Sequence, residues 1–307
     1  MTKRLCFLLV LVFMSLPAAG QSSDRAILVL LSDFGLTEHY VATMKGVAYS
    51  VDGSLQVQDL THNIEPFDIW QASYQLKSTM SFWPEGTVFV AVVDPGVGTN
   101  RKSIVGRTGR GHYVVAPDNG IFTLIADAHG LDAIREIDEN LNRLPGSEDA
   151  HTFHGRDVYV FTGARLAAGV ISFAQVGPEL ESPVVRIPYQ KPTRSSSDVI
   201  VGNVAHVEQP FGNIVTNVSA EMITGWELEP GVDTQIYVEV LRSDKVIFSR
   251  PLPFVPSFGY VDDDEPLIYV DSAGIMGLAI NNGHFANVFN IYAGSSWSVR
   301  LTRMGSS

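Results

Sequence analysis

Three side chains capable of chemistry stand beside apolar segments of this sequence. Asp33 directly follows a first apolar run, and Asp94 directly follows a later one. His154 lies just ahead of a third apolar run and is followed by Gly155, which permits close approach of a ligand to the backbone. If the runs before the two aspartates are parallel strands, their carboxyl ends line one crevice, where two carboxylates can meet one ligand.

Each of these residues also has a structural explanation. An aspartate before Pro-Gly, as in Asp94-Pro95-Gly96, is a good turn former, and Asp33 can cap a turn in the same way. A lone histidine is more often structural than catalytic. Two aspartates at equivalent strand ends favour a site, and together with His154 they could also be the metal ligands of a hydrolase.

The first half of the sequence alternates between apolar runs of strand length and segments with helical spacing. We expect strands at residues 26–32, 55–60, 87–93 and 113–116, and helices at residues 38–49, 69–82, 120–129 and 158–168. Continuous apolar runs are typical of strands that are buried on both faces of a sheet. The alternation predicts an α/β domain over residues 25–187, with a mainly parallel sheet flanked by helices.

The pattern changes in the second half of the chain. Two prolines and three consecutive serines indicate a linker at residues 188–198. Short alternating segments follow at residues 198–207, 235–240, 245–249, 267–270, 277–281 and 297–301. They predict a smaller, mainly antiparallel, β-barrel-like domain over residues 199–305.

Residues 1–20 have the order of a signal peptide. A short positive end precedes the almost wholly apolar residues 5–16, and small residues at 17–20 supply a cleavage site. The alternative is a buried N-terminal helix or strand. We expect an exported protein, periplasmic or secreted, whose mature form has no thiol because the single cysteine, Cys6, is removed.

Composition and missing motifs argue against several classes of protein. The chain of 307 residues has a formal net charge of -12, so its overall field does not attract phosphate backbones, and nucleic acid is not an expected partner. The later sequence contains no apolar run long enough to cross a membrane, so we expect no membrane association of the mature form. Phosphate-loop, complete dinucleotide, zinc-protease and serine-hydrolase motifs are also missing, and we expect neither a metal nor a cofactor.

A set of short motifs occurs in a characteristic order along the chain. They are SDFG at 32–35, MKGV at 44–47, DLTH at 59–62, DPGVG at 94–98 with Arg101, PDNG at 117–120, TFHGRD at 152–157 and FGN at 211–213. With this ordered set the chain resembles the S-adenosylmethionine hydrolases, also called S-adenosylmethionine hydroxide adenosyltransferases, which are relatives of the fluorinase and chlorinase enzymes. Each motif alone is weak, but the ordered set is highly specific and spans both predicted domains.

The resemblance implies that S-adenosylmethionine and water react to give adenosine and L-methionine. Water or hydroxide attacks the ribose 5′ carbon in line with the sulfonium leaving group, so the water mainly needs to be held in place. In the family an Asp-Arg-His set positions and polarises this water, and the set maps to Asp94, Arg101 and His154. Arg101 can pair with Asp94 if the loop between them folds back. Which of the three accepts the proton stays open.

The resemblance also implies substrate-binding residues in both domains. Asp33 is expected to accept hydrogen bonds from the ribose hydroxyls, and Phe67 to pack near the ribose and the methionine chain. Phe211 and Asn213 are expected to meet the adenine by stacking and by edge hydrogen bonds. The full expected set is Asp33, Phe67, Phe153, Gly155, Glu208, Phe211, Asn213 and Ser272.

Several positions depart from the family pattern. Glu208 stands where relatives have an aspartate near the methionine amino group. Ser272 matches a residue that contacts the methionine carboxylate, but Ala273 stands where halogenating relatives have an arginine. Asp94 replaces the tyrosine of the fluorinase, and Gly155 replaces its halide-contacting serine. Both changes favour water as the nucleophile, because a carboxylate beside the attack site repels an anion.

Alternatives remain at this point. A 5′-halogenase acting on the same substrate and an exported, non-catalytic nucleoside-binding protein are the other interpretations. S-adenosylmethionine is made in the cytoplasm, so another 5′-substituted adenosine is also a candidate substrate for an exported enzyme. The family forms trimers with each site between the first domain of one subunit and the second domain of the next, and we therefore expect a homotrimer.

Overall fold

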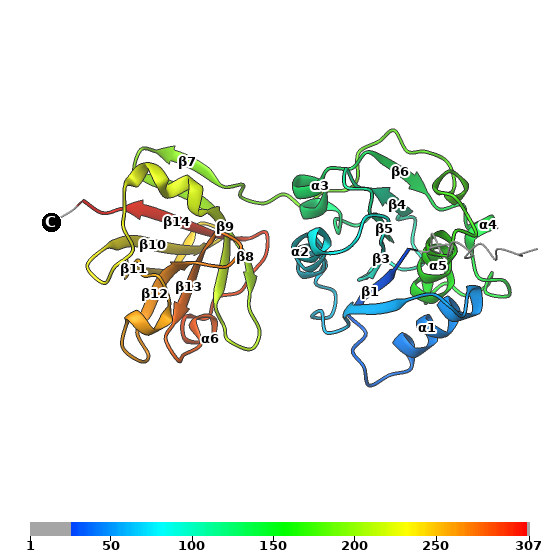
Figure 1. Cartoon of the computed structure of the whole chain (residues 1–307), viewed down its shortest axis with the longest axis horizontal. Coiled ribbons are helices and arrows are strands. Elements are labelled where there is room, and N and C mark those ends of the chain that lie inside the picture. Colours follow the sequence, from blue (N-terminus) through cyan, green and yellow to red (C-terminus); the bar gives the residue numbers. More distant parts are fainter. Residues whose placement is uncertain (1–25, 306–307) are drawn as a thin grey trace, which may run out of the picture.

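The computed structural model describes residues 26–305, which form two lobes joined by one segment of the chain (Figure 1). The predicted signal peptide, residues 1–20, lies outside the described residues. Within residues 26–305, no helix combines the length and the apolar character that crossing a membrane requires.

The first lobe contains a mixed sheet of six strands, ordered β2-β1-β3-β5-β4-β6. The strands are β1 (Leu28–Ser32), β2 (Val57–Thr61), β3 (Val88–Val92), β4 (Ser103–Arg107), β5 (Tyr113–Pro117) and β6 (Ala133–Glu136). Strands β2, β1, β3 and β5 run parallel, whereas β4 is antiparallel to both β5 and β6. The predicted mainly parallel sheet is confirmed, with one reversed strand that the sequence pattern did not indicate.

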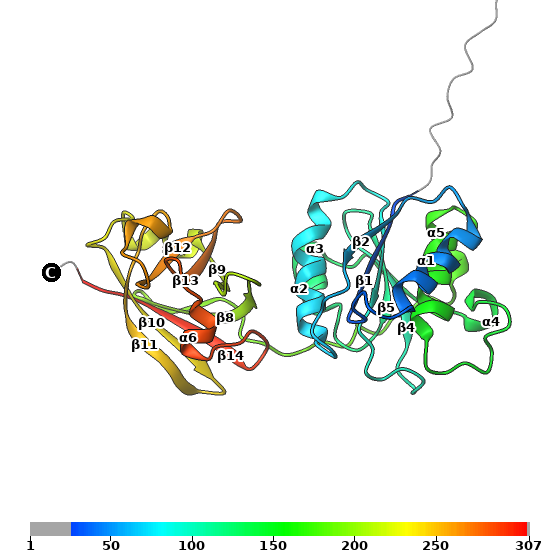
Figure 2. The same ribbon diagram turned by 90° about the horizontal axis from the view of Figure 1, so that it is seen from below.

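Helices cover both faces of this sheet (Figure 2). The helices of the lobe are α1 (Tyr40–Val51), α2 (Ile69–Thr79), α3 (Thr123–His129), α4 (Glu139–Asn142) and α5 (Phe161–Ala167). The core on one face joins α1 and α5 to the sheet, and the core on the other face joins α2 and α3 to it. Helix α5 lies very close to the sheet, because a Cβ atom on Gly163 would stand 2.5 Å from the Val90 side chain.

The second lobe is an antiparallel sheet that closes almost into a barrel. Its strands are β7 (Thr193–Ser196), β8 (Val199–Val207), β9 (Ile214–Ser219), β10 (Gln235–Arg242), β11 (Lys245–Pro253), β12 (Pro266–Val270), β13 (Ile275–Ile280) and β14 (Trp297–Arg303). The order is β11-β10-β14-β8-β9-β13-β12, and a bridge between Phe254 and Ile268 brings the two ends together. Large side chains fill the interior, including Trp226 and Phe285, the second of which begins the short helix α6 (Phe285–Phe289). The predicted β-barrel-like architecture is confirmed.

The predicted linker is more structured than its composition indicates. Within residues 188–198, β7 pairs with β8 along the edge of the barrel. The segment Thr193–Ser196 therefore belongs to the second lobe, because an exposed strand of small polar residues can still satisfy its backbone hydrogen bonds by pairing with a neighbour.

Aromatic side chains connect the two lobes. The indole N–H of Trp70 on α2 donates to the Ala205 carbonyl on β8 at 2.9 Å. One helical turn further, Tyr74 stacks on His206, with the ring centroids 4.5 Å apart and the planes 16° from parallel. Burial at this junction lowers the pKa of His206 to about 4. Its imidazole is therefore neutral in the folded protein over most of the accessible pH range.

The junction predicts a loss of stability in acid. In the unfolded chain His206 takes up a proton near pH 6.5, whereas in the folded protein it does so only near pH 4. Its contribution to stability is therefore complete above pH 6.5 and falls as the pH drops toward 4. The free energy of unfolding should fall between pH 7 and pH 4.5, and we expect His206→Phe to make this fall smaller by roughly 1–3 kcal/mol. Urea unfolding at both pH values measures it. His39→Phe, at an exposed ring, is the control, and equal pH dependence in both variants would contradict this explanation.

Candidate active site

Asp33 occupies the first position after β1, at the carboxyl edge of the sheet. Its Oδ2 accepts a hydrogen bond from the backbone N–H of Phe67 at 2.9 Å, which ties the β1 loop to the segment before α2. Phe67 has a φ of 71° in the left-handed region, and its ring is 68% exposed. A non-glycine residue in this conformation is uncommon and requires support from its surroundings, here the bond to Asp33.

Asp94 lies just beyond β3, the strand next to β1, and its carboxylate is paired with Arg101. The guanidinium Nε is 3.0 Å from both carboxylate oxygens, and Nη2 donates to Oδ2 at 2.6 Å. The Arg101 and Asp94 side chains are only 10% and 4% exposed. Backbone bonds from Val97 to Asp94 and from Thr99 to Gly96 turn the intervening loop back on itself. The loop thus folds as the pairing of the two residues requires.

His154 contacts this pair from the start of the turn that leads into α5. Its Nδ1 is 2.9 Å from Arg101 Nη2, and because a guanidinium can only donate, Nδ1 accepts when the ring carries its proton on Nε2. His154 leads into a π-helical turn, Gly155–Val160, which continues into α5. A Cβ on Gly155 would stand 2.9 Å from the Val92 side chain, so glycine lets this turn approach the end of β3. Turns of this kind occur frequently at functional sites.

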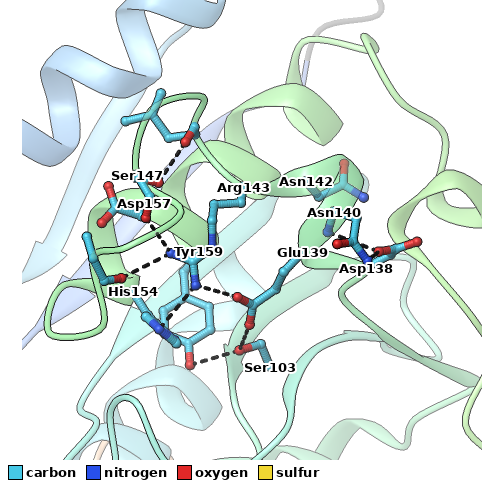
Figure 3. Close-up of polar contacts among 12 residues, drawn as sticks. Ser103, Asp138, Glu139, Asn140, Asn142, Arg143, Ser147, His154, Asp157 and Tyr159 are labelled. Atoms are coloured by element: carbon cyan, nitrogen blue, oxygen red, sulfur yellow. Dashed lines mark hydrogen bonds and ion pairs between the residues drawn. The ribbon is translucent and has the colours of Figure 1, made fainter.

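Tyr159 is a member of the site that the sequence patterns did not reveal. Its hydroxyl donates to Asp94 Oδ2 at 3.1 Å, and the Arg101 guanidinium lies over its ring, 5.6 Å from the centroid. Ser103 places its hydroxyl 3.4 Å from that of Tyr159 (Figure 3). The same hydroxyl accepts from Arg101 Nη1 at 3.1 Å. Burial raises the pKa of Tyr159 well above its usual value, so the hydroxyl keeps its proton and remains a donor.

The charges of the site set the protonation state of the histidine. Burial, followed by the nearby Arg101 guanidinium, lowers the pKa of His154 below its usual value. The pKa of Arg101 is raised, because the hydrogen bond and charge of Asp94 outweigh the opposing effect of burial. At neutral pH the site therefore holds a cationic guanidinium and a neutral imidazole side by side. Such a pair can orient a small polar molecule and can accept a proton from it.

A small cavity of about 100 Å³ opens beside these residues. Its lining includes every site residue predicted in the first lobe except Arg101, which contacts the cavity residues Asp94 and His154. The predicted residues that line it are Asp33, Phe67, Asp94, Phe153, His154 and Gly155. The structure thus brings together side chains from four separate connections at the carboxyl edge of the sheet.

The predicted residues of the second lobe line other cavities. Glu208, Phe211 and Asn213 surround a cavity of about 760 Å³, where Asn213 Nδ2 donates to Glu208 Oε2 at 3.0 Å and the Phe211 ring is 66% exposed. Ser272 lines a cavity of about 660 Å³ at the junction of the lobes, which Glu208 also borders. Within one chain, therefore, the two groups of predicted residues do not meet.

The metal-hydrolase interpretation lacks a suitable set of ligands in residues 26–305. No group of three or more His, Cys, Asp or Glu side chains there is arranged to hold a metal ion. Asp94 is instead engaged by Arg101 and Tyr159, so its oxygens already accept several hydrogen bonds.

The buried hydroxyl of Tyr159 predicts a measurable effect on stability. Tyr159→Phe removes a hydrogen bond to a buried carboxylate, and we expect a loss of about 1–2 kcal/mol in the free energy of unfolding, measured in urea at pH 7. Tyr189→Phe removes a similar bond to Asp127 at the surface and serves as the matched control, with a smaller expected loss. Equal losses in the two variants would show that burial of the Asp94 bond is unimportant.

Known proteins with related sequences share both lobes. An (R)-S-adenosyl-L-methionine hydrolase of Salinispora tropica is 34% identical over 265 residues, which span 86% of this chain and 93% of the relative. A fluorinase of an Actinoplanes species is 29% identical, over 92% of this chain and 99% of the relative. The crystal structure of an uncharacterized conserved protein from Thermotoga maritima superposes with a TM-score of 0.79 at 34% identity, covering 90% of this chain and all of that one.

Family models match the two lobes separately. Residues 28–177 match the SAM hydroxide adenosyltransferase N-terminal domain, and residues 202–298 match the C-terminal domain. These ranges include every candidate site residue described above. The chain is therefore an enzyme that belongs to the SAM hydroxide adenosyltransferase family.

Proposed function

We propose that this enzyme hydrolyses S-adenosyl-L-methionine to adenosine and L-methionine. The observation that carries the proposal is the contact of Asp94, Arg101 and His154 at the carboxyl edge of the sheet, beside the ribose-binding candidate Asp33. Several relatives are named (R)-S-adenosyl-L-methionine hydrolases, which supports the same substrate and reaction for this chain.

The proposed reaction is an in-line displacement at the ribose 5′ carbon. The water oxygen forms a bond to that carbon as the carbon–sulfur bond breaks, and the electron pair of the broken bond neutralises the sulfonium. The attacking water loses one proton, which passes to His154 or Asp94 and then to solvent. The set thus acts by holding a single water in line and accepting its proton, while the small cavity excludes other water.

Two features support water rather than halide as the nucleophile. The Asp94 carboxylate, only 4% exposed and paired with Arg101, offers oxygens that can accept a hydrogen bond from a water but not from a halide. Gly155 offers no hydroxyl that could donate to a halide. Fluorinases are nevertheless among the relatives, so 5′-halogenation of the same substrate is the alternative to be tested.

We further propose that the active site is completed between subunits of a homotrimer. Phe211 and Asn213, the expected adenine contacts, line a cavity apart from that of Asp94, and the Phe211 ring is largely exposed. A second subunit could place this exposed group against the first-lobe cavity. This arrangement would give each site one lobe from each of two neighbouring chains.

The N-terminal segment supports a location outside the cytoplasm. Its order of positive, apolar and small residues is that of a signal peptide, so we propose that the mature enzyme is exported. An exported enzyme meets little S-adenosylmethionine made in its own cell, and another 5′-substituted adenosine is therefore the second candidate substrate.

Product analysis tests the proposed reaction. The mature protein incubated with S-adenosylmethionine should release equal amounts of adenosine and methionine, detected by chromatography. Asp94→Asn and His154→Ala should each lower kcat by roughly 100-fold or more, because each removes a group that holds the water or accepts its proton. Arg300→Gln, at a surface ion pair of the second lobe, should leave the rate unchanged.

Two outcomes would replace the proposal. A 5′-halogenated deoxyadenosine formed in chloride or fluoride would identify the enzyme as a halogenase. Tight binding of adenosine without any turnover of S-adenosylmethionine or of other 5′-substituted adenosines would contradict hydrolysis altogether.

Mixed oligomers test the shared site. Asp94→Ala and Asn213→Ala subunits should each be inactive alone. Their co-expression should restore about a quarter of the wild-type activity per site, because some interfaces combine two intact lobes. The control is the doubly substituted chain co-expressed with wild type at equal amounts, which should retain about a quarter if sites are shared and about half if they are not. No restoration in the first mixture would place the complete site within one chain.

A further inference from the structure

Both ring nitrogens of His154 face a guanidinium group. Nδ1 is 2.9 Å from Nη2 of Arg101. Nε2 is 3.3 Å from Nη2 of Arg143 (Figure 3). A guanidinium has only donors, and a neutral imidazole has one N–H and one lone pair. The neutral ring can therefore accept from one of the two arginines, whereas an imidazolium could accept from neither.

Arg143 is held firmly in this position. Its Nη2 also donates to the Glu139 carboxylate, and its Nη1 lies 3.2 Å from the carbonyl oxygens of both Ser147 and Ala150. The Arg143 side chain is only 10% exposed. Three partners thus hold this largely buried cation against the imidazole. Burying a charge costs free energy unless its hydrogen bonds are made.

The topology of the sheet delivers this second arginine. Strand β6 ends at the same edge as β3 and β5, because it is antiparallel to the reversed strand β4. Helix α4, with Glu139 at its start, follows β6 at once, and Arg143 follows α4. Glu139 also lies 3.5 Å from the Ser103 hydroxyl, which accepts from Arg101. The two arginines are therefore connected by one chain of polar contacts.

His154 separates two cavities of different size. It lines the small cavity that contains Asp33 and Asp94, and it also lines an outer cavity of about 790 Å³. Arg143 and Glu139 line only the outer one. They therefore contact the imidazole from outside the proposed substrate cavity.

We propose that Arg143, held by Glu139, is a positioning residue that keeps His154 neutral and fixes the plane of its ring. The effect on the reaction rests on the proposed function. Only a neutral imidazole has a lone pair, and His154 would have to exchange its contact with Arg101 for the proton of the attacking water. An imidazolium in the same place would meet donors at both nitrogens and would have no lone pair for that proton.

The charges around the ring act in opposite directions. After burial, Arg101 and Arg143 lower the pKa of His154, whereas Glu139 and Asp94 raise it. The buried hydroxyl of Tyr159 also faces the ring, with the centroids 6.5 Å apart. Three further charged or titratable side chains, His151, Glu148 and Arg165, line the outer cavity. The proposal therefore predicts shifts of opposite sign when Arg143 and Glu139 are changed one at a time.

Proton titration of the His154 ring by NMR tests the proposal directly. The ring signal is assigned by its loss in His154→Gln. Arg143→Gln should raise the pKa of His154 by about 0.5–1 unit, because a neighbouring cation is removed, and Glu139→Gln should lower it by a similar amount. Arg165 also lines the outer cavity but makes no contact with His154. Arg165→Gln removes the same charge and should leave the pKa of His154 unchanged.

The pH dependence of turnover provides a second test of the role of Arg143. The neutral ring is active, so activity is lost as the pH falls through the pKa of His154. The acidic limb of kcat/KM should therefore move to higher pH in Arg143→Gln and to lower pH in Glu139→Gln. Arg143→Lys keeps the charge, so its acidic limb should stay at the wild-type pH. It serves as the second variant if Arg143→Gln does not fold.

The outcomes separate this proposal from the proposed function. Unchanged titration of His154 in both variants, or shifts of the same sign, would overturn the positioning role even in an enzyme that hydrolyses S-adenosylmethionine. Opposite shifts in a protein that does not turn over this substrate would support the positioning of His154 and contradict the proposed reaction instead.

Discussion

The buried ion pair between Asp94 and Arg101 is the interaction on which the rest of the site depends. Removing two charges from water is costly, and their attraction repays that cost only when the remaining hydrogen bonds are also satisfied. Here the guanidinium engages both carboxylate oxygens, and the buried hydroxyl of Tyr159 adds a further bond. The same guanidinium donates to His154. One pair thus closes the loop after β3, neutralises a buried carboxylate and orients the imidazole.

The reversed strand β4 explains how an arginine reaches this pair. Ser103, the first residue of β4, is paired with Pro117 at the end of β5, so β4 begins at the edge where the parallel strands of the sheet end. Arg101 precedes Ser103 and therefore lies at the carboxyl edge. A parallel strand in this place would begin at the opposite edge and carry Arg101 away from Asp94. The mixed character of the sheet is therefore a requirement of the site, and β6 extends it by bringing Glu139 and Arg143 to the same edge.

The elements that could be predicted are those in which a continuous local pattern of apolar residues indicates burial. Strands β1 and β3 are entirely buried runs, and the helices beside them repeat their apolar residues at helical spacing. Strands β4 and β6 escaped prediction because charged residues, Arg107, Arg135 and Glu136 among them, interrupt their apolar pattern. Tyr159 was missed for a related reason. A tyrosine within an apolar helix resembles any other core residue until a carboxylate is found beside its hydroxyl.

The sequence by itself determined that Asp33 and Asp94 follow buried strands, and its ordered motifs indicated the family and the three residues of the proposed catalytic set. Only the tertiary structure decided that Arg143 faces His154 and that Asn213 lies in a cavity apart from Asp94. The reason is physical. Local patterns reflect burial and turns among near neighbours in the chain, whereas the partner of a buried charge depends on the order and direction of strands, which the packing of the whole sheet sets.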